Sequence, residues 1–257
     1  MAKAPTRIAL LGAGGRMGQA VLSAAAGRED LEISSALVRP GSPLLADKQT
    51  IAYTTDLKAA VAGCDVLLDF SLPESTVAAL AACVAAGKPL VSGVTGMDAA
   101  LKAALEKAGT RIPVLAAANM SLGVALLTRM AEQAARILGP DFDIEIAEAH
   151  HRHKKDAPSG TALALGAAVS RARGVPVPDK ATERSGARRP GSIGYSVVRA
   201  GDIVGEHTVL FAGAGERLEL SHRAQSRQTF AQGALAAARW IVGRPAGVYT
   251  LADTLGG

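Results

Sequence analysis

Residues that can transfer protons and bind anions are concentrated between Glu145 and Ala162, in the stretch EIAEAHHRHKKDAPSGTA. Histidine suits acid/base catalysis because its unperturbed pKa, about 6.5, lies near neutral pH. Lysine becomes a usable acid where burial or neighbouring cations lower its pKa. The histidines and lysines of this stretch are therefore the candidate proton donors of the chain.

The same stretch contains a candidate anion site. Asp156 to Thr161 has the composition of a turn that feeds a helix, with Ser159 as the N-cap. Backbone amides at the start of a helix bind anions, so we expect the amides around Gly160 and Thr161 to form a seat for an anion. One loop would then serve both proton transfer and substrate binding.

Two other interpretations of this stretch remain open. Imidazoles are common metal ligands, but Arg152, Lys154 and Lys155 surround the histidines with like charge, which disfavours a bound cation. A solvated basic loop without chemistry would be favoured if the cluster stood alone. The glycine-rich turn near the N-terminus argues against that interpretation.

Alternating apolar and polar residues from Ile144 to Ala149 predict a strand, so His150 and His151 are expected where it runs out into the loop. Near the N-terminus, Arg7 to Leu11 predicts another strand, followed by a glycine turn over residues 12–18 and a helix over 17–26. A strand at residues 32–38 completes a βαβ unit, which is typical of dinucleotide binding.

The glycine turn departs from the strict GxGxxG pattern. Met17 occupies the place of the third glycine and Gly18 follows it, so a turn without a ligand remains an alternative. Where an acidic side chain would bind the adenosine ribose, the chain has Val38 followed by Arg39. Arg39, with Arg16, is suited to pairing with a ribose 2′-phosphate, which favours NADPH over NADH. A solvent-facing arginine is the competing interpretation.

Further strands are expected at residues 66–70, 89–92 and 114–117, separated by alanine-rich helices at 73–86 and 98–108. This alternation predicts a parallel sheet with helices on both faces. Ser92 to Gly96 and Ala117 to Met120 each follow a strand, at the edge where such a sheet holds its ligand. Both segments could line the nicotinamide half of a cofactor.

Beyond Asn119 the pattern changes to a mixed α+β arrangement. It comprises a helix at 123–138, a strand at 143–149, the histidine loop, another helix, and strands at 193–199, 207–211 and 217–221. Residues 174–191, rich in Pro, Arg and Gly, predict a loop, and 229–242 predicts an amphipathic helix that could return to the first domain.

Composition narrows the class of protein. The 257 residues are 49% hydrophobic and only 3% aromatic, so a substantial core is possible and base-stacking platforms for nucleic acid are not expected. The net charge of +5 is modest and scattered, which favours small anionic ligands. Cys64 and Cys83 have no metal or disulfide spacing, and no membrane span or signal peptide is evident, so we expect a cytoplasmic protein.

Two segments, GAGGRMG at the start and EAHHRHKKDAPSGTA in the middle, together resemble the dihydrodipicolinate reductase family of lysine biosynthesis. SGVTG, AAANMSLGV and residues 198–227 extend the resemblance over nearly the whole chain. It implies NAD(P)H-dependent reduction of 4-hydroxy-tetrahydrodipicolinate, a cyclic dicarboxylate, to tetrahydrodipicolinate by a cytoplasmic homotetramer.

The resemblance also implies domains and residue roles. A Rossmann-type dinucleotide-binding domain is expected over residues 1–121 and a mixed α+β substrate-binding and oligomerisation domain over 122–228, with 229–257 returning to the first. His150 and Lys154 would be catalytic, and His151, Gly160 and Thr161 would bind substrate. The implied cofactor residues are Gly12, Ala13, Gly14, Gly15, Arg16, Met17, Arg39, Gly93, Val94, Thr95, Ala117, Ala118, Asn119 and Met120.

Val38 is a departure from the family, because many members carry an acidic residue there and also use NADH. Two rival functions remain: a related dehydrogenase acting on another small dicarboxylate or aldehyde, and a sensor that binds NADPH without chemistry. Comparing turnover on different substrates would distinguish the first rival from the reductase. Oxidation of NADPH only when substrate is present would exclude the second.

Overall fold

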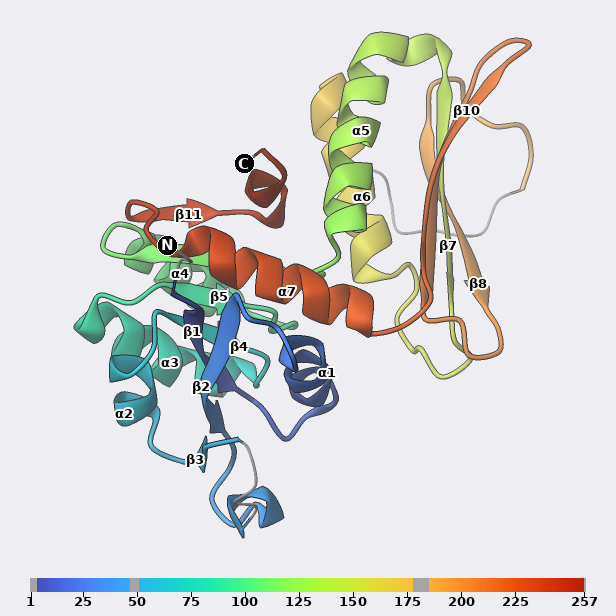
Figure 1. Cartoon of the computed structure of the whole chain (residues 1–257). Helices are drawn as coiled ribbons and strands as arrows, with labels where there is room; N and C mark the ends of the chain where they lie inside the picture. Colours follow the sequence, from blue (N-terminus) through green and yellow to red (C-terminus); the bar gives the residue numbers. More distant parts are fainter. Residues whose placement is uncertain (1–3, 47–50, 178–184, 257) are drawn as a thin grey trace. The chain divides into compact units, whose positions relative to one another are not determined.

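Strands from the first half of the chain, joined by a short strand near the C-terminus, form a seven-stranded parallel sheet, which confirms the expected Rossmann-type architecture (Figure 1). The computed structural model describes residues 4–46, 51–177 and 185–256 and divides the chain into two units. Unit 1 comprises Met1–Leu122 and Arg227–Gly257, and unit 2 comprises Gly123–Ser226.

The sheet of unit 1 has the strand order β11-β6-β5-β4-β1-β2-β3. Because β1 has β2 on one side and β4 on the other, the order reverses at β1, and the carboxyl edge beside β1 is where such sheets bind ligands. The strands are β1 (Thr6–Leu11), β2 (Leu31–Leu37), β3 (Tyr53–Thr54), β4 (Val66–Asp69), β5 (Leu90–Ser92), β6 (Pro113–Ala116) and β11 (Gly247–Tyr249).

Helices cover both faces of this sheet. On one face α1 (Arg16–Ala25) packs on α7 (Gln228–Ile241), which lies against β4, β5 and β6. The other layer contains α2 (Leu57–Ala62), α3 (Pro73–Ala86) and α4 (Ala99–Gly109), whose apolar side chains share a core with buried strand residues such as Leu67 and Leu90. Burial of the strands on both faces explains their continuous apolar runs.

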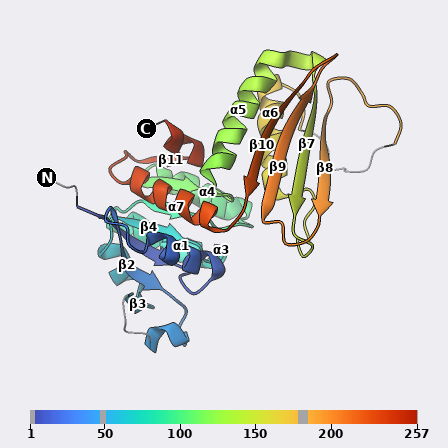
Figure 2. The same ribbon diagram turned by 45° about the vertical axis from the view of Figure 1, so that its right-hand side comes forward.

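Unit 2 contains a mixed four-stranded sheet with the order β10-β9-β7-β8, as the pattern beyond Asn119 predicts. The central β7 (Asp143–His150) pairs parallel with β8 (Ile193–Arg199) and antiparallel with β9 (Gly205–Ala212), and β10 (Arg217–Ala224) forms an edge. Within this unit, α5 (Leu122–Leu138) and α6 (Gly160–Arg173) lie along one face of the sheet (Figure 2).

The buried face of β7 changes character along the strand. Ile144 and Ile146 are fully buried in the core with the two helices, and the next two positions of the same face are Glu148, 3% exposed, and His150, 9% exposed. Side chains on a strand alternate between its two faces, so Glu148 and His150 lie on the same face as the buried isoleucines. A carboxylate and an imidazole are therefore placed at the end of an otherwise apolar face.

Several short elements have no strong sequence signal. The two- and three-residue strands β3 and β11 and the six-residue helix α2 are absent from the sequence-based expectations, since so few residues carry no periodicity. Short 3₁₀ helices occur at Pro43–Ala46, Gly139–Asp141 and Leu251–Leu255. Residues 178–184 of the expected 174–191 loop lie outside the described residues, and its described flanks contain no helix or strand.

Candidate active site

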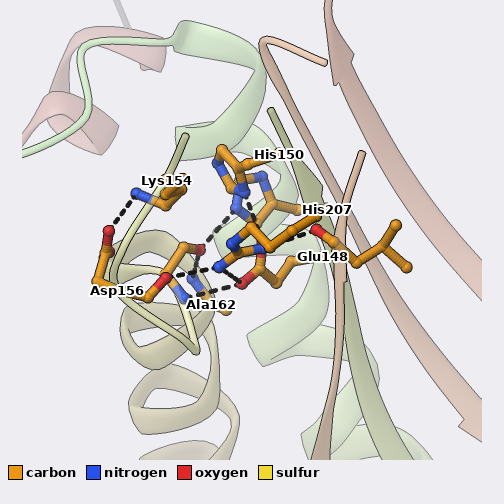
Figure 3. A network of polar contacts seen from close by, with 9 residues as sticks. Glu148, His150, Lys154, Asp156, Ala162 and His207 are labelled. Carbon is orange, nitrogen blue, oxygen red and sulfur yellow. Dashed lines mark hydrogen bonds and ion pairs between the residues drawn. The ribbon is translucent and has the colours of Figure 1, made fainter. Parts of the chain in front are cut away.

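A buried carboxylate organises the end of β7. Arg199 donates two parallel hydrogen bonds to Glu148, from Nη1 to Oε2 at 2.8 Å and from Nη2 to Oε1 at 2.7 Å. The Ser159 amide donates to Oε1 at 2.9 Å, and His150 Nδ1 lies 2.5 Å from Oε2. Strand register explains the cluster, because Arg199 of β8 pairs with His150 of β7. Figure 3 shows this network.

The charges of this cluster follow from its partners. Burial alone would raise the pKa of Glu148, but the hydrogen bonds from Arg199, His150 and Ser159 outweigh it, so the pKa lies below its usual value. Burial lowers the pKa of His150 by more than its hydrogen bond to Glu148 raises it. At neutral pH the cluster therefore contains an ionised carboxylate, a neutral imidazole and a guanidinium.

His207 is a second buried imidazole beside the first. Its ring meets that of His150 edge to face, with 5.2 Å between centroids, and its Nε2 lies 3.2 Å from Ser159 Oγ. Burial lowers the pKa of His207 to about 4, so this ring stays neutral at physiological pH. The sequence contains no local signal for it, since only pairing of β9 with β7 brings it to this position.

The turn after the strand also has the expected form. Ser159 is the N-cap of α6, and its Oγ accepts a hydrogen bond from the Ala162 amide at 3.2 Å. Gly160 and Thr161 form the first turn of that helix. The hydrogen bond from the Ser159 amide to Glu148 fixes the start of α6 beside the histidines.

The basic residues of the loop lie at its surface. Lys154 is half-buried and pairs through Nζ with Asp156 Oδ1 at 2.9 Å, and the carbonyl of Asp156 accepts a hydrogen bond from Arg199 at 2.6 Å. His151 is half-buried with an Nδ1 that has no hydrogen-bond partner among the described residues. His153 and Lys155 are exposed.

In unit 1 the glycine turn is held against the end of β2. The amides of Gly12 and Ala13 both donate to the Leu37 carbonyl, at 3.2 and 3.0 Å. Gly12 has φ +84°, and a Cβ there would overlap the Phe70 carbonyl, so glycine is required. Gly15, the N-cap of α1, makes no side-chain capping bond. The first-turn amides of α1 and the absence of side chains at Gly14 and Gly15 fit a pyrophosphate.

Arg16 and Arg39 are exposed, and Met17 is half-buried. Val38 lies at the end of β2 beside the glycine turn, with its Cγ1 3.7 Å from the position of a Cβ on Gly14. An apolar side chain therefore stands where an acidic one would meet an adenosine ribose, with Arg39 following it.

The other two predicted cofactor segments follow neighbouring strands of the same sheet. Gly93, Val94 and Thr95 come after β5, and Ala117, Ala118, Asn119 and Met120 come after β6. The Gly93 amide donates to the Asp69 carbonyl at 2.8 Å, and the Ala117 amide to the Ser92 carbonyl at 3.0 Å. Val94 and Met120 are buried, so these two can offer a ligand mainly their backbone.

Asp69, at the end of β4, lies between the segment that follows β5 and the glycine turn that follows β1, and it was not anticipated from the sequence. It is fully buried and accepts hydrogen bonds from the Ser71 amide and hydroxyl and from the hydroxyls of Thr76 and Ser92. Burial raises the pKa of Asp69, and these hydrogen bonds counter only part of that effect. A signal existed, because Asp69 ends an otherwise apolar strand.

The described residues contain neither a candidate metal site nor a candidate membrane span. Within residues 4–46, 51–177 and 185–256, no group of three or more His, Cys, Asp or Glu side chains is placed to hold a metal ion. The helices of the same residues include none that is both long and apolar enough to span a bilayer. Cys64 and Cys83 are free and buried.

A doubly wound parallel sheet with a glycine turn at its switch point, in one chain with a unit that carries an imidazole–carboxylate cluster, defines the class of nicotinamide-dependent oxidoreductases. Models of the dihydrodipicolinate reductase N-terminus and C-terminus match residues 6–120 and 123–255. The chain belongs to the dihydrodipicolinate reductase family.

Individual members of the family are similar to this chain over nearly its whole length. The chain is 50% identical to the 4-hydroxy-tetrahydrodipicolinate reductase of Thiobacillus denitrificans, covering 97% of this chain and 98% of the relative. It is 48% identical to that of Pseudomonas fluorescens over similar shares, 97% and 98%. The dipicolinate-bound dihydrodipicolinate reductase of Paenisporosarcina sp. TG-14 has the same fold, with a TM-score of 0.78, 24% identity and coverage of 96% and 97%.

Proposed function

We propose that this chain is a 4-hydroxy-tetrahydrodipicolinate reductase, which reduces its cyclic dicarboxylate substrate to tetrahydrodipicolinate in the diaminopimelate route to lysine. The observation that carries the proposal is 50% identity to a reductase of that name over 97% of the chain. The Glu148–His150 pair beside the start of α6 supports it, because it combines an acid/base group with an anion-binding helix start.

Bound NADPH supplies the hydride. The residues of unit 1 would bind and orient it: the turn from Gly12 to Met17 would hold the pyrophosphate, chiefly through the first-turn amides of α1, because the amides of Gly12 and Ala13 already donate to Leu37. The backbones of Gly93–Thr95 and Ala117–Met120 would line the nicotinamide half. Arg39, exposed beside Val38, pairs with the 2′-phosphate, with Arg16 as a second cation. We therefore propose a preference for NADPH, with NADH as a weaker alternative.

The residues of unit 2 bind the substrate and transfer the proton. His151, Gly160 and Thr161 hold the two carboxylates through charge-assisted and amide hydrogen bonds. Hydride addition to the conjugated imine leaves negative charge that a proton must neutralise, and His150 or Lys154 donates it. Lys154 can leave its exposed partner Asp156 at little cost, because exposed ion pairs are weak.

An absorbance assay with enzymatically generated substrate tests reaction and cofactor together. We expect oxidation of NADPH only when the substrate is supplied, and slower oxidation of NADH. Equal rates with aldehydes or dicarboxylates that lack a ring imine would favour a different dehydrogenase. Tight NADPH binding without turnover of any substrate would favour a nucleotide sensor.

We also propose that the protein is a cytoplasmic homotetramer. The buried free thiols of Cys64 and Cys83 suit a reducing compartment. The face of the unit 2 sheet away from α5 and α6 includes Val198, which is 51% exposed, and suits pairing with other copies. Light scattering on the purified protein should give four times the chain mass, and a monomer at working concentration would contradict the assembly.

A further inference from the structure

Glu148 is a buried charged group to which the proposed reaction assigns no task. Only 3% of the residue is exposed, and its two oxygens receive four donors from three elements: Arg199 twice, the Ser159 amide and His150 Nδ1. So complete a set of partners keeps a buried carboxylate ionised. An ionised carboxylate is an acceptor only.

That property determines the tautomer of the neighbouring ring. Because Glu148 Oε2 can only accept, the proton between it and His150 belongs to Nδ1, and Nε2 of the neutral ring is left as the base. No described residue makes a hydrogen bond to Nε2. The side of the ring near Nε2 faces Gly205, where a Cβ would come within 3.1 Å of Nε2, so glycine leaves this atom uncrowded.

Arg199 connects the same carboxylate to the loop. Its Nη2 donates both to Glu148 Oε1 and to the Asp156 carbonyl, at 2.7 and 2.6 Å. Asp156 is also the partner of Lys154. The other Glu148 contact, with the Ser159 amide, holds the N-cap of α6. Glu148 thus links the imidazole, the lysine-bearing loop and the anion-binding helix start.

We propose that Glu148, held by Arg199, is a positioning residue that fixes the Nδ1–H tautomer of His150, so that Nε2 is the atom that exchanges the reaction's proton. The Nδ1 proton stays on the ring throughout, and Nε2 takes up a proton from solvent and gives it to the substrate. The proposal rests on the proposed function for the chemistry, but the tautomer itself can be measured without substrate.

The variant Glu148→Gln tests the proposal. An amide side chain can donate as well as accept, so the single tautomer is no longer enforced. We expect nitrogen NMR of the imidazoles, with His150 assigned by substitution, to show only the Nδ1–H form in the unmodified protein and a mixture in the variant. We expect kcat to fall about 100-fold, more than KM changes, because the positioned proton transfer is lost.

The pH profile provides a readout that a merely structural role would not move. Glu148, Arg199, Lys154 and His207 all face His150, and of these only Glu148 raises its pKa, while the cations lower it. Nε2 must carry a proton to donate it, so kcat falls as pH rises through the pKa of His150, and removing the carboxylate's charge should shift this alkaline limb to lower pH. An alkaline limb unchanged from that of the unmodified protein would overturn the proposal.

Glu145→Gln is the matched control. Glu145 is on the opposite face of the same strand and has its own arginine, with Arg188 Nη1 2.8 Å from Oε2. We expect it to keep the tautomer, the pH profile and kcat of the unmodified protein. Equal losses of kcat in the two variants, with unchanged His150 signals in both, would reduce Glu148 to a structural role and overturn the proposal.

Two further measurements keep the outcomes distinct. Should Glu148→Gln fail to fold, the unmodified protein still decides, because an Nε2–H tautomer of His150 there would refute the proposal. Should the unmodified protein bind NADPH but fail to reduce the dicarboxylate, the proposed function fails while the tautomer measurement still tests the positioning of the ring.

Discussion

The two units each bury one carboxylate at the end of a strand, with opposite electrostatic results. Asp69 is surrounded by neutral hydroxyls and one amide, and burial raises its pKa. Glu148, equally enclosed, has a guanidinium and an imidazole as partners, and its pKa lies below the usual value. The difference teaches that burial alone does not set the direction in which the pKa of a carboxyl group shifts; the charge of its hydrogen-bond donors decides it.

The comparison extends to what each carboxylate organises. Asp69 ties the ends of β4 and β5 together next to the glycine turn of unit 1, where backbone groups are offered to a ligand. Glu148 ties an imidazole to a helix start in unit 2, where the candidate proton donors lie. We therefore expect unit 1 to carry cofactor binding and unit 2 to carry chemistry.

The sharpest separation of the two units comes from the double variant His150→Ala with Lys154→Ala. We expect kcat to fall about 10⁴-fold, because both candidate proton donors are lost, while NADPH affinity remains nearly unchanged. Steady-state kinetics and fluorescence titration measure the two effects. His153→Ala, an exposed neighbour, serves as control. Loss of NADPH binding with normal turnover at saturation would contradict the division of cofactor binding and chemistry between the two units.

The second-largest effect is expected in the unfolding free energy, which should depend more on Glu148 than on Asp69. Glu148→Gln leaves Arg199 without its buried counterion, so we expect unit 2 to lose about 3 kcal/mol of unfolding free energy at neutral pH. The pKa of Glu148 is lowered in the folded state, so this contribution is present above the ordinary pKa of about 4.3 and is lost as pH falls below it. Hydrogen exchange of β7 amides measures it, with β4 amides as the internal control. A difference in unfolding free energy between variant and unmodified protein that persisted at low pH would contradict the lowered pKa of Glu148.

Cofactor selection should depend on unit 1 alone. Arg39→Ala should weaken NADPH binding about 30-fold and leave NADH binding unchanged, because only NADPH carries the 2′-phosphate. Arg7→Ala removes an exposed cation at the opposite end of the sheet and should alter neither affinity. Equal weakening of both cofactors by Arg39→Ala would place the arginine elsewhere on the nucleotide.

The smallest effect is expected for Asp69→Asn. The hydroxyls of Thr76 and Ser92 can rotate to accept from the amide, so we expect a loss below about 1 kcal/mol at neutral pH. Because the pKa of Asp69 is raised in the folded state, the unmodified protein should gain stability relative to this variant as pH falls from neutral toward about 3.9. Urea unfolding followed through Trp240 of α7 tests the sign, which is opposite to that of Glu148.

Much of the fold follows from local patterns. Apolar runs, alanine-rich helical segments and glycine turns predict the strands and helices of unit 1 between β1 and β6, except β3 and α2. Those two and β11 could not be predicted, because a strand of two or three residues gains its stability from pairing with a neighbour that lies far away in the chain.

The candidate sites show the same division. His150, Lys154 and the capping Ser159 are within ten residues of one another, so spacing alone identifies them. Glu148 could have been identified from the alternation of the strand, because it lies two residues after Ile146 on the same buried face. Arg199 and His207 could not, because they reach the site only through pairing of β8 and β9 with β7.

The sequence by itself therefore determined which groups can do chemistry and which strands and turns carry them, because composition, periodicity and spacing are local properties. The tertiary structure decided their protonation. The direction in which the pKa of a carboxyl group shifts, and which nitrogen of a histidine bears the proton, depend on burial and on donors that strand pairing brings from distant parts of the chain.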